Sequence, residues 1–373
     1  MTLKVSWEQA LAWRMRRQLL DPIGRMSVPD VVRRLGGVQA QVASSAELAV
    51  RVRRQSSRAG EVNRALSEGL LIKTWAMRGT LHLLTPEEGG AFLSLLAAGR
   101  SWERPSWVRW FGVGSREIET LRAVVREVLD GTVMTREELV AAVSVQPGLG
   151  HVGDELRSGW GTLLKPLAWQ GDLCFGPMRG SRVTFMRPDH ASSRWAGVPD
   201  PDDAAPTVIG AYLRAYGPAT VENFRSFMAR GRISARQLRG WFAAAAGRLA
   251  EVDVDGDRAL VLAEDQDELA ATKASAEVRL LPGFDQYVMG PGTEDGHVVP
   301  ATRRSAVSKQ SGWIAPVVVL GGVVRGTWEL DGDIARISWF GEQGSPPRDA
   351  FKEEVTRLSS ILERPLGTEV HPI

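Results

Sequence analysis

Apolar and charged residues recur at helical spacing through the first part of the chain, with turn-forming residues between the groups. Such spacing favours helices because it places the apolar side chains on one helix face. Ser6 and Ser27 stand where an N-cap is expected, and Gly36–Gly37 stands where a helix should end. The pattern therefore predicts short helices at residues 6–20, 27–37, 44–55 and 61–69.

The pattern changes at residues 70–84, where apolar and β-favouring residues flank a central Arg78–Gly79 turn. This arrangement predicts a β-hairpin. Several short helices closed by a hairpin is the order of elements in a winged helix-turn-helix unit. The first part of the chain is therefore predicted to form one such unit.

The same order of elements recurs twice. The second round is predicted to consist of three helices and a hairpin, at 115–131, 135–145, 154–172 and 173–186, with Thr135 as a cap. Its turn, PMRGS, echoes the AMRGT of the first hairpin, which favours an internal repeat. The third round follows a Pro/Asp-rich linker at 196–206 and is predicted at 207–218, 220–231, 234–247 and 249–264. Thr220 and Ser234 are its expected caps, and Asp255–Gly256 its hairpin turn.

The last part of the chain is rich in strand-forming residues. It includes a predicted hairpin on Gly321–Gly322, a strand at 333–340 and a closing helix at 347–363. The predicted fold class is mainly α with β (α+β), with three tandem winged helix-turn-helix units and a C-terminal β-rich element. The predicted boundaries are 1–112, 113–200, 206–270 and 271–373.

Length and composition agree with a globular protein of two or three domains, since 373 residues are 43% hydrophobic and 24% charged. No apolar run reaches the roughly 18 residues needed to span a bilayer. The N-terminal sequence lacks the order of regions that marks a signal peptide, so a cytoplasmic location is expected. The single cysteine, Cys174, excludes internal disulfides and is expected to be a buried strand residue.

Charge is distributed unevenly although the net charge is only +2. Arginines dominate residues 1–60, whereas residues 251–268 are strongly acidic. This asymmetry permits a basic face for a polyanion, but arginines also solvate helices in proteins that bind no polyanion. Winged-helix units most often bind nucleic acid, and many serve only as scaffolds.

The common catalytic and cofactor motifs are missing, and the five histidines have no metal-ligand spacing, so neither a cofactor nor a metal is expected. One unusual feature is a pair of amides, Gln39 and Gln41, directly after Gly36–Gly37. Residues two apart share one face of an extended chain. The pair could be polar residues of a loop, or it could hold a small group between its amides.

Two further sets of residues permit two interpretations each. His82 alternates with leucines in the first hairpin and could be a hydrogen-bonded strand residue or a polar lining of a pocket. Arg303, Arg304 and Lys309 are interspersed with serines and offer the donors used for phosphate contacts, but they could equally form a solvated loop.

Four segments together resemble the AlkZ-like winged-helix DNA glycosylases: LGGVQAQ, RGTLHLLTPEE, LLPGFDQYVMG and VVVLGGVVRGTW. The resemblance extends over essentially the whole chain. It implies tandem winged helices in a C-shape around a DNA channel. It also implies removal of alkylated purines and unhooking of interstrand crosslinks, as in bacterial self-resistance to azinomycin-type alkylating antibiotics.

In this family the catalytic motif is a glutamine, an aliphatic residue, and then glutamine or aspartate. Gln39 and Gln41 match it, and Ala40 is smaller than the middle residue of some members. The double-amide form resembles the crosslink-resistance branch. The resemblance also places His82, Arg78, Arg303, Arg304 and Lys309 as candidate contacts to the DNA.

Two amides are chemically sufficient for one class of substrate. An N7-alkylated purine already carries a positive charge and leaves as a neutral base, so no general acid is needed. Gln39 and Gln41 could hold a water beneath C1′ while their carbonyl dipoles stabilise the developing positive charge. The expected enzyme is therefore a monofunctional glycosylase that acts on double-stranded DNA with alkylated or crosslinked purines. It is expected to be a monomer, since nothing in the sequence indicates a coiled coil or an exposed dimer helix.

Two alternatives explain part of the sequence. A winged-helix transcriptional regulator accounts for the helices and arginines but gives the glutamine pair no role. A non-catalytic scaffold makes the pair ordinary loop residues. A lyase mechanism is less expected because no lysine falls in these motifs, and Lys73 is expected at a helix end that precedes the first hairpin.

Overall fold

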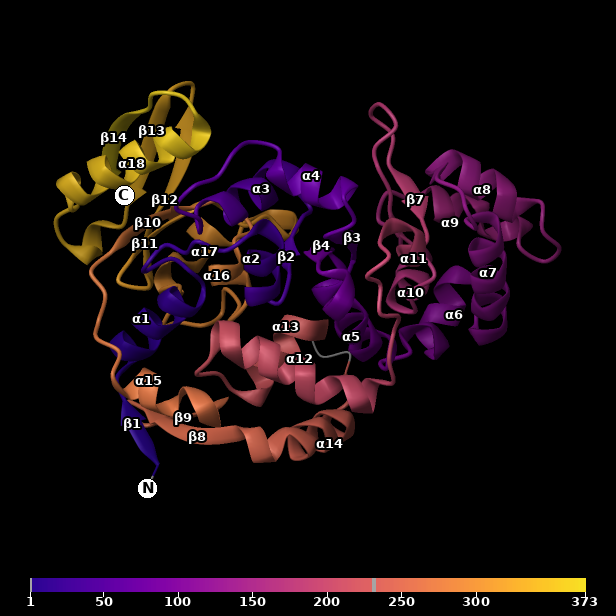
Figure 1. The fold of residues 1–373 in the computed structure, drawn as a ribbon, viewed down its shortest axis with the longest axis horizontal. Helices are drawn as coiled ribbons and strands as arrows, with labels where there is room; N and C mark the ends of the chain where they lie inside the picture. Colours follow the sequence, from indigo (N-terminus) through magenta and orange to yellow (C-terminus); the bar gives the residue numbers. More distant parts are fainter. Residues whose placement is uncertain (1, 230–232) are drawn as a thin grey trace. The chain divides into compact units, whose positions relative to one another are not determined.

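The computed structural model of the chain describes residues 2–229 and 233–373, and it combines helices with strands along its whole length (Figure 1). The predicted mixture of helices and strands is thus confirmed. The chain forms two compact units. Unit 1 contains residues 1–62, 209–227 and 244–373, and unit 2 contains residues 63–208 and 228–243.

Unit 1 begins with the predicted short helices. They are α1 (Trp7–Arg17), α2 (Val28–Arg34) and α3 (Ala43–Arg51), each shorter than expected. The Ser6 hydroxyl accepts from the Gln9 amide at 3.2 Å, and the Gln9 side chain accepts from the Ser6 amide at 3.1 Å. Ser27 caps α2 in a similar way through the Asp30 amide. Local capping therefore sets where α1 and α2 start, as predicted, whereas α3 begins without a side-chain cap.

The C-terminal part of unit 1 is a five-stranded sheet in the order β10-β11-β12-β13-β14. Its strands are β10 (Val278–Leu281), β11 (Val317–Leu320), β12 (Val323–Asp331), β13 (Ile334–Trp339) and β14 (Gly367–Pro372). The predicted hairpin on Gly321–Gly322 joins β11 to β12, and both glycines have positive φ. The sequence did not predict β14, which pairs in parallel with β13.

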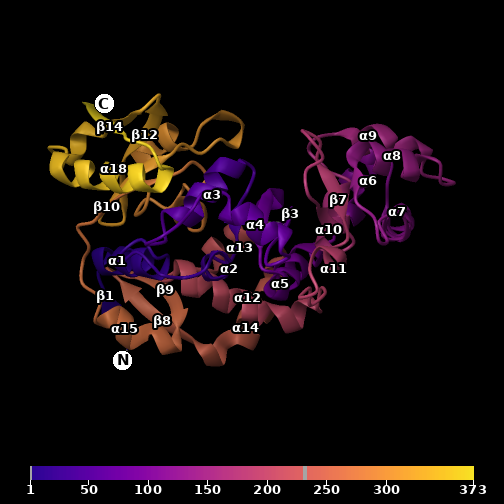
Figure 2. The ribbon, with the colours of Figure 1, turned by 45° about the horizontal axis from the view of Figure 1, so that its top comes forward.

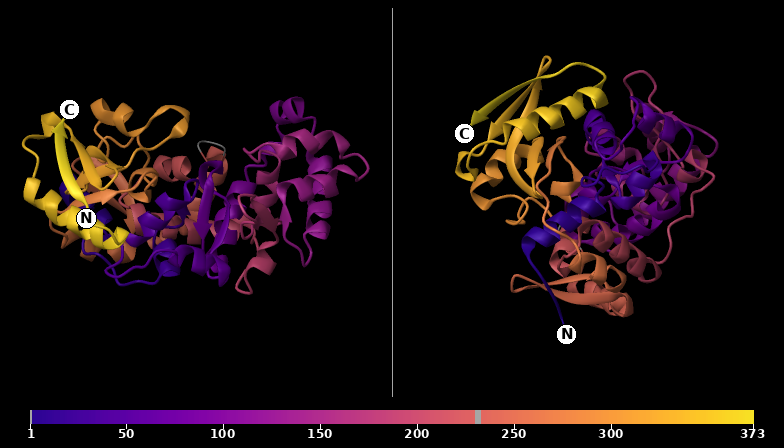
Figure 3. Two further views of the ribbon diagram at one scale, coloured as in Figure 1. Left: turned by 90° about the horizontal axis from the view of Figure 1, so that it is seen from above. Right: turned by 60° about the vertical axis from the view of Figure 1, so that its left-hand side comes forward.

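The predicted closing helix, α18 (Arg348–Leu362), lies along one face of this sheet (Figure 3). Phe351, Val355 and Leu358 enter a buried cluster with residues from β10 to β13. These three residues repeat at helical spacing, so one stripe of α18 covers the sheet.

A second sheet of unit 1 has three strands, β1 (Leu3–Val5), β8 (Leu249–Val254) and β9 (Asp257–Leu262), with helix α15 (Gln266–Ala270) nearby (Figure 2). The hairpin on Asp255–Gly256 is confirmed. The parallel pairing of β1 with β8 was not predicted. It joins segments nearly 250 residues apart, as the bond from the Trp7 amide to Asp255 also shows.

Unit 2 contains the first two predicted hairpins. β3 (Ile72–Trp75) pairs with β4 (Leu81–Leu84), and β6 (Cys174–Phe175) pairs with β7 (Thr184–Met186). With β5 (Met134–Thr135), these strands lie in the order β4-β3-β6-β7-β5. Cys174 is fully buried, and burial raises the pKa of its thiol to about 12, as suits a core residue.

Unit 2 includes the helices α5 (Pro86–Ala97), α6 (Pro105–Phe111), α7 (Ser115–Val128), α8 (Arg136–Ser144), α9 (Gly153–Arg157), α10 (Leu164–Trp169) and α11 (Pro188–Ala191), and α4 (Glu61–Ser67) extends into it. The predicted helices at 115–131 and 135–145 correspond to α7 and α8, and Thr135 accepts from the Glu138 amide as its cap. Neither α5 nor α6 was predicted.

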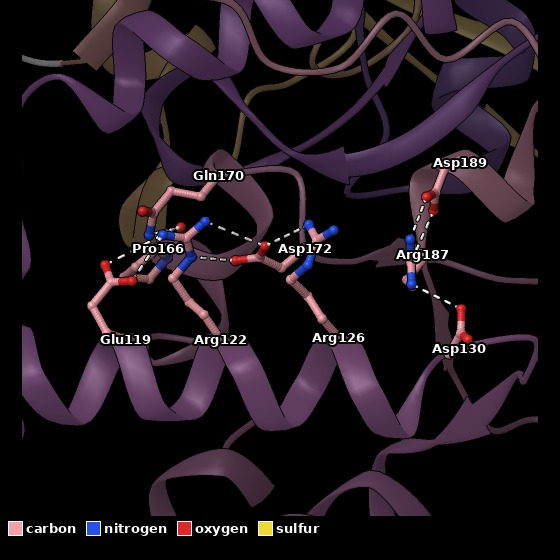
Figure 4. A network of polar contacts seen from close by, with 9 residues as sticks. All are labelled: Glu119, Arg122, Arg126, Asp130, Pro166, Gln170, Asp172, Arg187 and Asp189. Carbon is pink, nitrogen blue, oxygen red and sulfur yellow. Dashed lines mark hydrogen bonds and ion pairs between the residues drawn. The ribbon is translucent and has the colours of Figure 1, made fainter.

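A buried carboxylate ties α7 to the turn after α10 (Figure 4). Asp172 is fully buried and accepts from Arg122 Nε at 2.6 Å and from Arg126 at 3.2 Å. Burial raises the pKa of Asp172, and the two guanidinium groups oppose that shift. A separate pair joins Arg187 to Asp130 at the end of α7. These contacts fix the helical layer of unit 2 against its sheet.

Three local expectations were wrong. The single helix predicted at 154–172 is split into α9 and α10, because Gly161 has a φ of +60° and a Cβ there would lie 2.2 Å from Trp75. The predicted linker at 196–206 is partly helical, since α12 (Pro201–Tyr216) begins inside it. Lys73 lies on β3 and not at a helix end.

The third round contains α12, α13 (Val221–Ala229) and α14 (Ala235–Ala245) before the β8–β9 hairpin. Thr220 and Ser234 accept from the Asn223 and Gln237 amides, which confirms both caps. The last residues of the helix predicted at 220–231 lie outside the described residues. The winged-helix geometry, the C-shape and the four predicted boundaries stay predictions. In the described parts of the chain, no helix is long and apolar enough to cross a membrane.

Candidate active site

The glutamine segment follows directly from the end of α2. Gly36 and Gly37 have φ values of +62° and +112°, which turn the chain sharply after Leu35. The strand β2 (Val38–Gln39) then runs for only two residues before a bend leads into α3. Residues other than glycine adopt such φ values at a cost, so the double glycine makes this abrupt reversal possible.

The two glutamines lie in different environments. Gln39 is 3% exposed, and its Oε1 atom is buried without a hydrogen-bond partner in the described part of the chain. Gln41 is exposed. Because the chain stays extended only to Gln39, the predicted two-residue alternation does not continue to Gln41. A buried carbonyl without a donor is well suited to bind a group that enters from outside.

The segment after the glutamines rests on the core of unit 1. Val42 packs against a buried cluster that includes Phe284, Tyr287 and Val288. The base of this cluster is held by an ion pair, in which both Arg53 and Asp285 are fully buried. Two parallel bonds of 2.7 Å join them, and the guanidinium also donates to a backbone carbonyl of α3 at 2.8 Å. A bidentate pair of this kind fixes the orientation of both partners.

The same aspartate caps the short helix α16 (Gln286–Met289), where it accepts from the Tyr287 amide at 2.8 Å. The first residue of α16, Gln286, is fully buried, and neither of its amide atoms has a hydrogen-bond partner in the described part of the chain. Gln286 lies within the segment LLPGFDQYVMG and was not predicted to be a site residue. The feature that singles out Gln286 is a buried amide without hydrogen-bond partners among the described residues. Burial cannot be read from a single sequence.

His82 lies on β4 in unit 2 and is fully buried. Its Nδ1 donates to the Thr80 carbonyl at 3.0 Å, and its Nε2 has no hydrogen-bond partner in the described part of the chain. Arg78, in the hairpin turn, has a φ of +59° and lines a small cavity with Gly79, Ser101 and Trp169. Whether either residue contacts DNA stays a prediction.

We expect His82 to make the protein sensitive to acid. Burial lowers the pKa of His82 to about 3, and the nearby Arg78 charge acts in the same direction. The folded state therefore binds fewer protons than the unfolded state between pH 3 and about 6.5, so stability falls as the pH falls through this range. The loss should be about 2 kcal/mol between pH 6.5 and 5.

Urea unfolding of unit 2 at both pH values measures this effect. In His82→Gln the loss of unfolding free energy between the two pH values should largely disappear. His151→Gln removes an exposed histidine from the same unit and should behave as the unchanged protein. An unaltered pH dependence in His82→Gln would contradict the assignment.

The predicted basic residues of unit 1 lie on a surface segment around α17 (Arg304–Val307). Arg303 pairs with Glu342 at 2.5 Å and Arg304 with Glu294 at 2.8 Å. Lys309 is exposed and forms no ion pair among the described residues. The three residues thus lie on one surface segment, and two of them, Arg303 and Arg304, already form ion pairs with carboxylates.

A tight exposed loop follows this segment. The Lys309 amide donates to the Trp313 carbonyl at 2.8 Å, and Ser308 bridges to Ile314. Positive φ values at Ser311 and Gly312 close the loop. Trp313 is 51% exposed while its ring meets Phe284 edge to face. The tip of the loop is therefore exposed, while the contact of Trp313 with Phe284 anchors its base in the core.

Comparison with known proteins identifies the family. The family described as DNA glycosylase AlkZ-like matches residues 32–361. A protein from Streptomyces sahachiroi described as "Interstrand DNA cross-link repair glycosylase" is 48% identical over 368 residues, which is 98% of this chain and 99% of that protein. The solved structure of Streptomyces sahachiroi DNA glycosylase AlkZ gives a TM-score of 0.96 at 46% identity, covering 99% of this chain and 100% of that one.

The matched region includes the glutamine segment, the buried Arg53–Asp285 pair and the basic loop. The expected family and the expected class of enzyme are both confirmed. This chain belongs to the AlkZ-like DNA glycosylases, which are hydrolases of N-glycosyl bonds.

Proposed function

We propose that this glycosylase hydrolyses the N-glycosidic bond of N7-alkylated purines and unhooks interstrand crosslinks, without lyase activity. The observation that carries the proposal is the buried, unpartnered Oε1 of Gln39 beside the exposed Gln41. The near full-length similarity to a protein named as a crosslink repair glycosylase supports the substrate class. The cellular role would be self-resistance to a DNA-alkylating natural product, exerted in the cytoplasm by a monomer bound to chromosomal DNA.

The proposed reaction relies on the charge of the substrate. The carbonyl of Gln39 accepts a hydrogen bond from a water placed beneath C1′, and its dipole stabilises the positive charge that develops on the sugar. Gln41 orients the same water or a sugar or phosphate oxygen. The C1′–N9 bond breaks, its electron pair neutralises the cationic base, and the water adds to C1′ with loss of a proton to solvent. Uncharged bases should react poorly because neither amide can protonate them.

We place the loop Lys309–Trp313 in contact with the minor groove. The other hairpin tips of unit 1 are less suitable. The tips at Asp255 and Asp331–Asp333 are acidic and would repel phosphates. The tip at Gly321–Gly322 packs inside, where a Cβ on Gly322 would lie 2.6 Å from Leu11. The loop Lys309–Trp313 is exposed and follows Arg303 and Arg304 in the same segment. When DNA binds, these two arginines would exchange their carboxylate partners for phosphates.

Lys309→Glu is expected to weaken binding to lesion-containing duplex DNA by about threefold to tenfold, because one phosphate contact is lost and a repulsion is added. The dependence of log Kd on log salt should flatten by about one unit. Fluorescence anisotropy at several salt concentrations measures both quantities.

Lys352→Glu is the matched control, because Lys352 is an exposed lysine on α18 that pairs with Asp349. This variant should bind DNA as the unchanged protein does. Equal affinity of the Lys309 and Lys352 variants would reject the loop as a DNA contact.

The substrate proposal is tested with duplexes that carry N7-methylguanine, a nitrogen-linked interstrand crosslink or no damage. We expect alkali-labile abasic sites in the first two duplexes, and separation of the crosslinked strands. Borohydride should trap no covalent complex, since a monofunctional enzyme forms no Schiff base. Sequence-specific binding without any base release would instead support the regulator alternative.

A further inference from the structure

Tyr216 occupies a position that links distant parts of unit 1 to the glutamine segment. It is the last residue of α12 and is fully buried. Its hydroxyl donates to the carbonyl of Leu35 at 2.5 Å, across 181 positions of sequence. Leu35 is itself fully buried and stands immediately before the Gly36–Gly37 turn that leads to Gln39. This bond holds the carbonyl that precedes the turn from outside α2.

The end of α12 is fixed by side chains of α1. Arg17 Nε donates to the Arg214 carbonyl at 3.0 Å, and the Gln18 amide donates to the Ala215 carbonyl at 3.2 Å. An Arg14 nitrogen donates to the Pro218 carbonyl at 2.7 Å. Carbonyls at a helix C-terminus lack partners within the helix, and cationic donors suit them best. The residue that bears the Tyr216 ring is therefore held at a fixed point.

The ring of Tyr216 is held as firmly as its backbone. Gly290, at the end of α16, lies against it so closely that a Cβ would come within 2.0 Å of the ring. The Phe227 ring lies on another side, with centroids 5.3 Å apart. Asp285, the partner of Arg53, is the N-cap of α16, so the helix whose C-cap contacts the ring begins at a buried ion pair.

We propose that Tyr216 is a positioning residue for catalysis, acting through the Leu35 carbonyl on the placement of Gln39. The inference rests on the proposed role of Gln39. Amides that neither donate nor remove protons accelerate a reaction only by placement, and a displacement of about 1 Å can cost about a hundredfold in rate. The Gly36 and Gly37 amides close the turn on α2 by donating to the Arg33 and Val32 carbonyls at 3.0 and 2.9 Å. The Tyr216 hydroxyl adds a constraint on Leu35 that comes from outside α2.

Tyr216→Phe removes only this hydroxyl, and Tyr287→Phe is the matched control. Tyr287 is equally buried, and its hydroxyl donates to the Gly322 carbonyl at 2.7 Å, in the turn between β11 and β12. Each variant loses one buried hydroxyl-to-carbonyl bond, so their losses of stability should be similar. Only the first bond belongs to the glutamine segment.

The test measures single-turnover release of N7-methylguanine from duplex DNA, the Kd for the same duplex and the melting temperature. We expect Tyr216→Phe to slow release by about tenfold to a hundredfold with Kd within twofold, and Tyr287→Phe to retain the unchanged rate. A rate within twofold of the unchanged protein for Tyr216→Phe would overturn the proposal. Equal slowing of both variants, or weaker binding with an unchanged rate, would also overturn it.

Gln39→Ala is measured in the same assay to separate the two proposals. Full activity of Gln39→Ala would contradict the proposed role of Gln39, whatever the Tyr216 variant does. A slow Gln39→Ala enzyme together with a normal Tyr216→Phe enzyme would leave the proposed function intact and reject the positioning role alone.

Discussion

Gln39→Ala is expected to slow excision of N7-alkylated purines by about a hundredfold to a thousandfold, the usual cost of removing one electrostatic stabiliser of a transition state. The substitution removes the buried Oε1 that has no partner in the described part of the chain. It should leave DNA affinity nearly unchanged, because the lost interaction forms only as positive charge develops on the sugar. Single-turnover base release and equilibrium binding to the same duplex measure the two effects separately.

Two further variants complete this test. Gln41→Ala should slow the reaction less than Gln39→Ala does, because the exposed amide of Gln41 only orients the water or a sugar or phosphate oxygen of the DNA. Gln55→Ala removes an amide of unit 1 that bonds to Arg25 and to the Ile23 carbonyl, and it should keep full activity. Normal rates in both the Gln39 and the Gln41 variants would overturn the mechanism while leaving the family membership in place.

Asp285→Ala is expected to destabilise unit 1 by about 3–5 kcal/mol, because it leaves the guanidinium of Arg53 buried without its counter-charge. Both side chains are 0% exposed, and the carboxylate also caps α16. Thermal and urea unfolding followed by tryptophan fluorescence measure the loss.

Glu294→Ala is the control, since Glu294 is 81% exposed in its pair with Arg304, which is also exposed. An exposed carboxylate of this kind should contribute about 1 kcal/mol or less. The double variant Arg53→Met, Asp285→Leu removes both charges and should recover part of the stability lost in Asp285→Ala. A loss below about 1 kcal/mol in Asp285→Ala would show that water reaches the pair and screens it.

Local signals predicted much of the fold correctly. Ser6, Ser27 and Thr135 marked helix starts because a side-chain oxygen bonds an amide only three residues away. The Asp255–Gly256 and Gly321–Gly322 turns marked hairpins because their backbone angles favour glycine. Such interactions lie within a few residues, so their chemistry is visible in the sequence.

The errors have a different origin. Gly161 interrupts a helical pattern because the Trp75 ring occupies the space beside it, and nothing in residues 154–172 reveals that ring. Strand β1 has only three residues and β14 has no buried residue, and both pair in parallel with partners reached only after folding. Their apolar patterns are too brief to distinguish them from loops.

For the candidate site, the sequence by itself determined the identity and spacing of Gln39 and Gln41, the double glycine before them, and their resemblance to a glycosylase motif. Only the tertiary structure decided that Gln39 is buried while Gln41 is exposed, that Arg53 pairs with Asp285 in the core of the same unit, and that Tyr216 bonds to Leu35. The physical reason is distance along the chain. Burial and long-range hydrogen bonds depend on which remote segments pack together, and the Tyr216–Leu35 bond spans 181 positions.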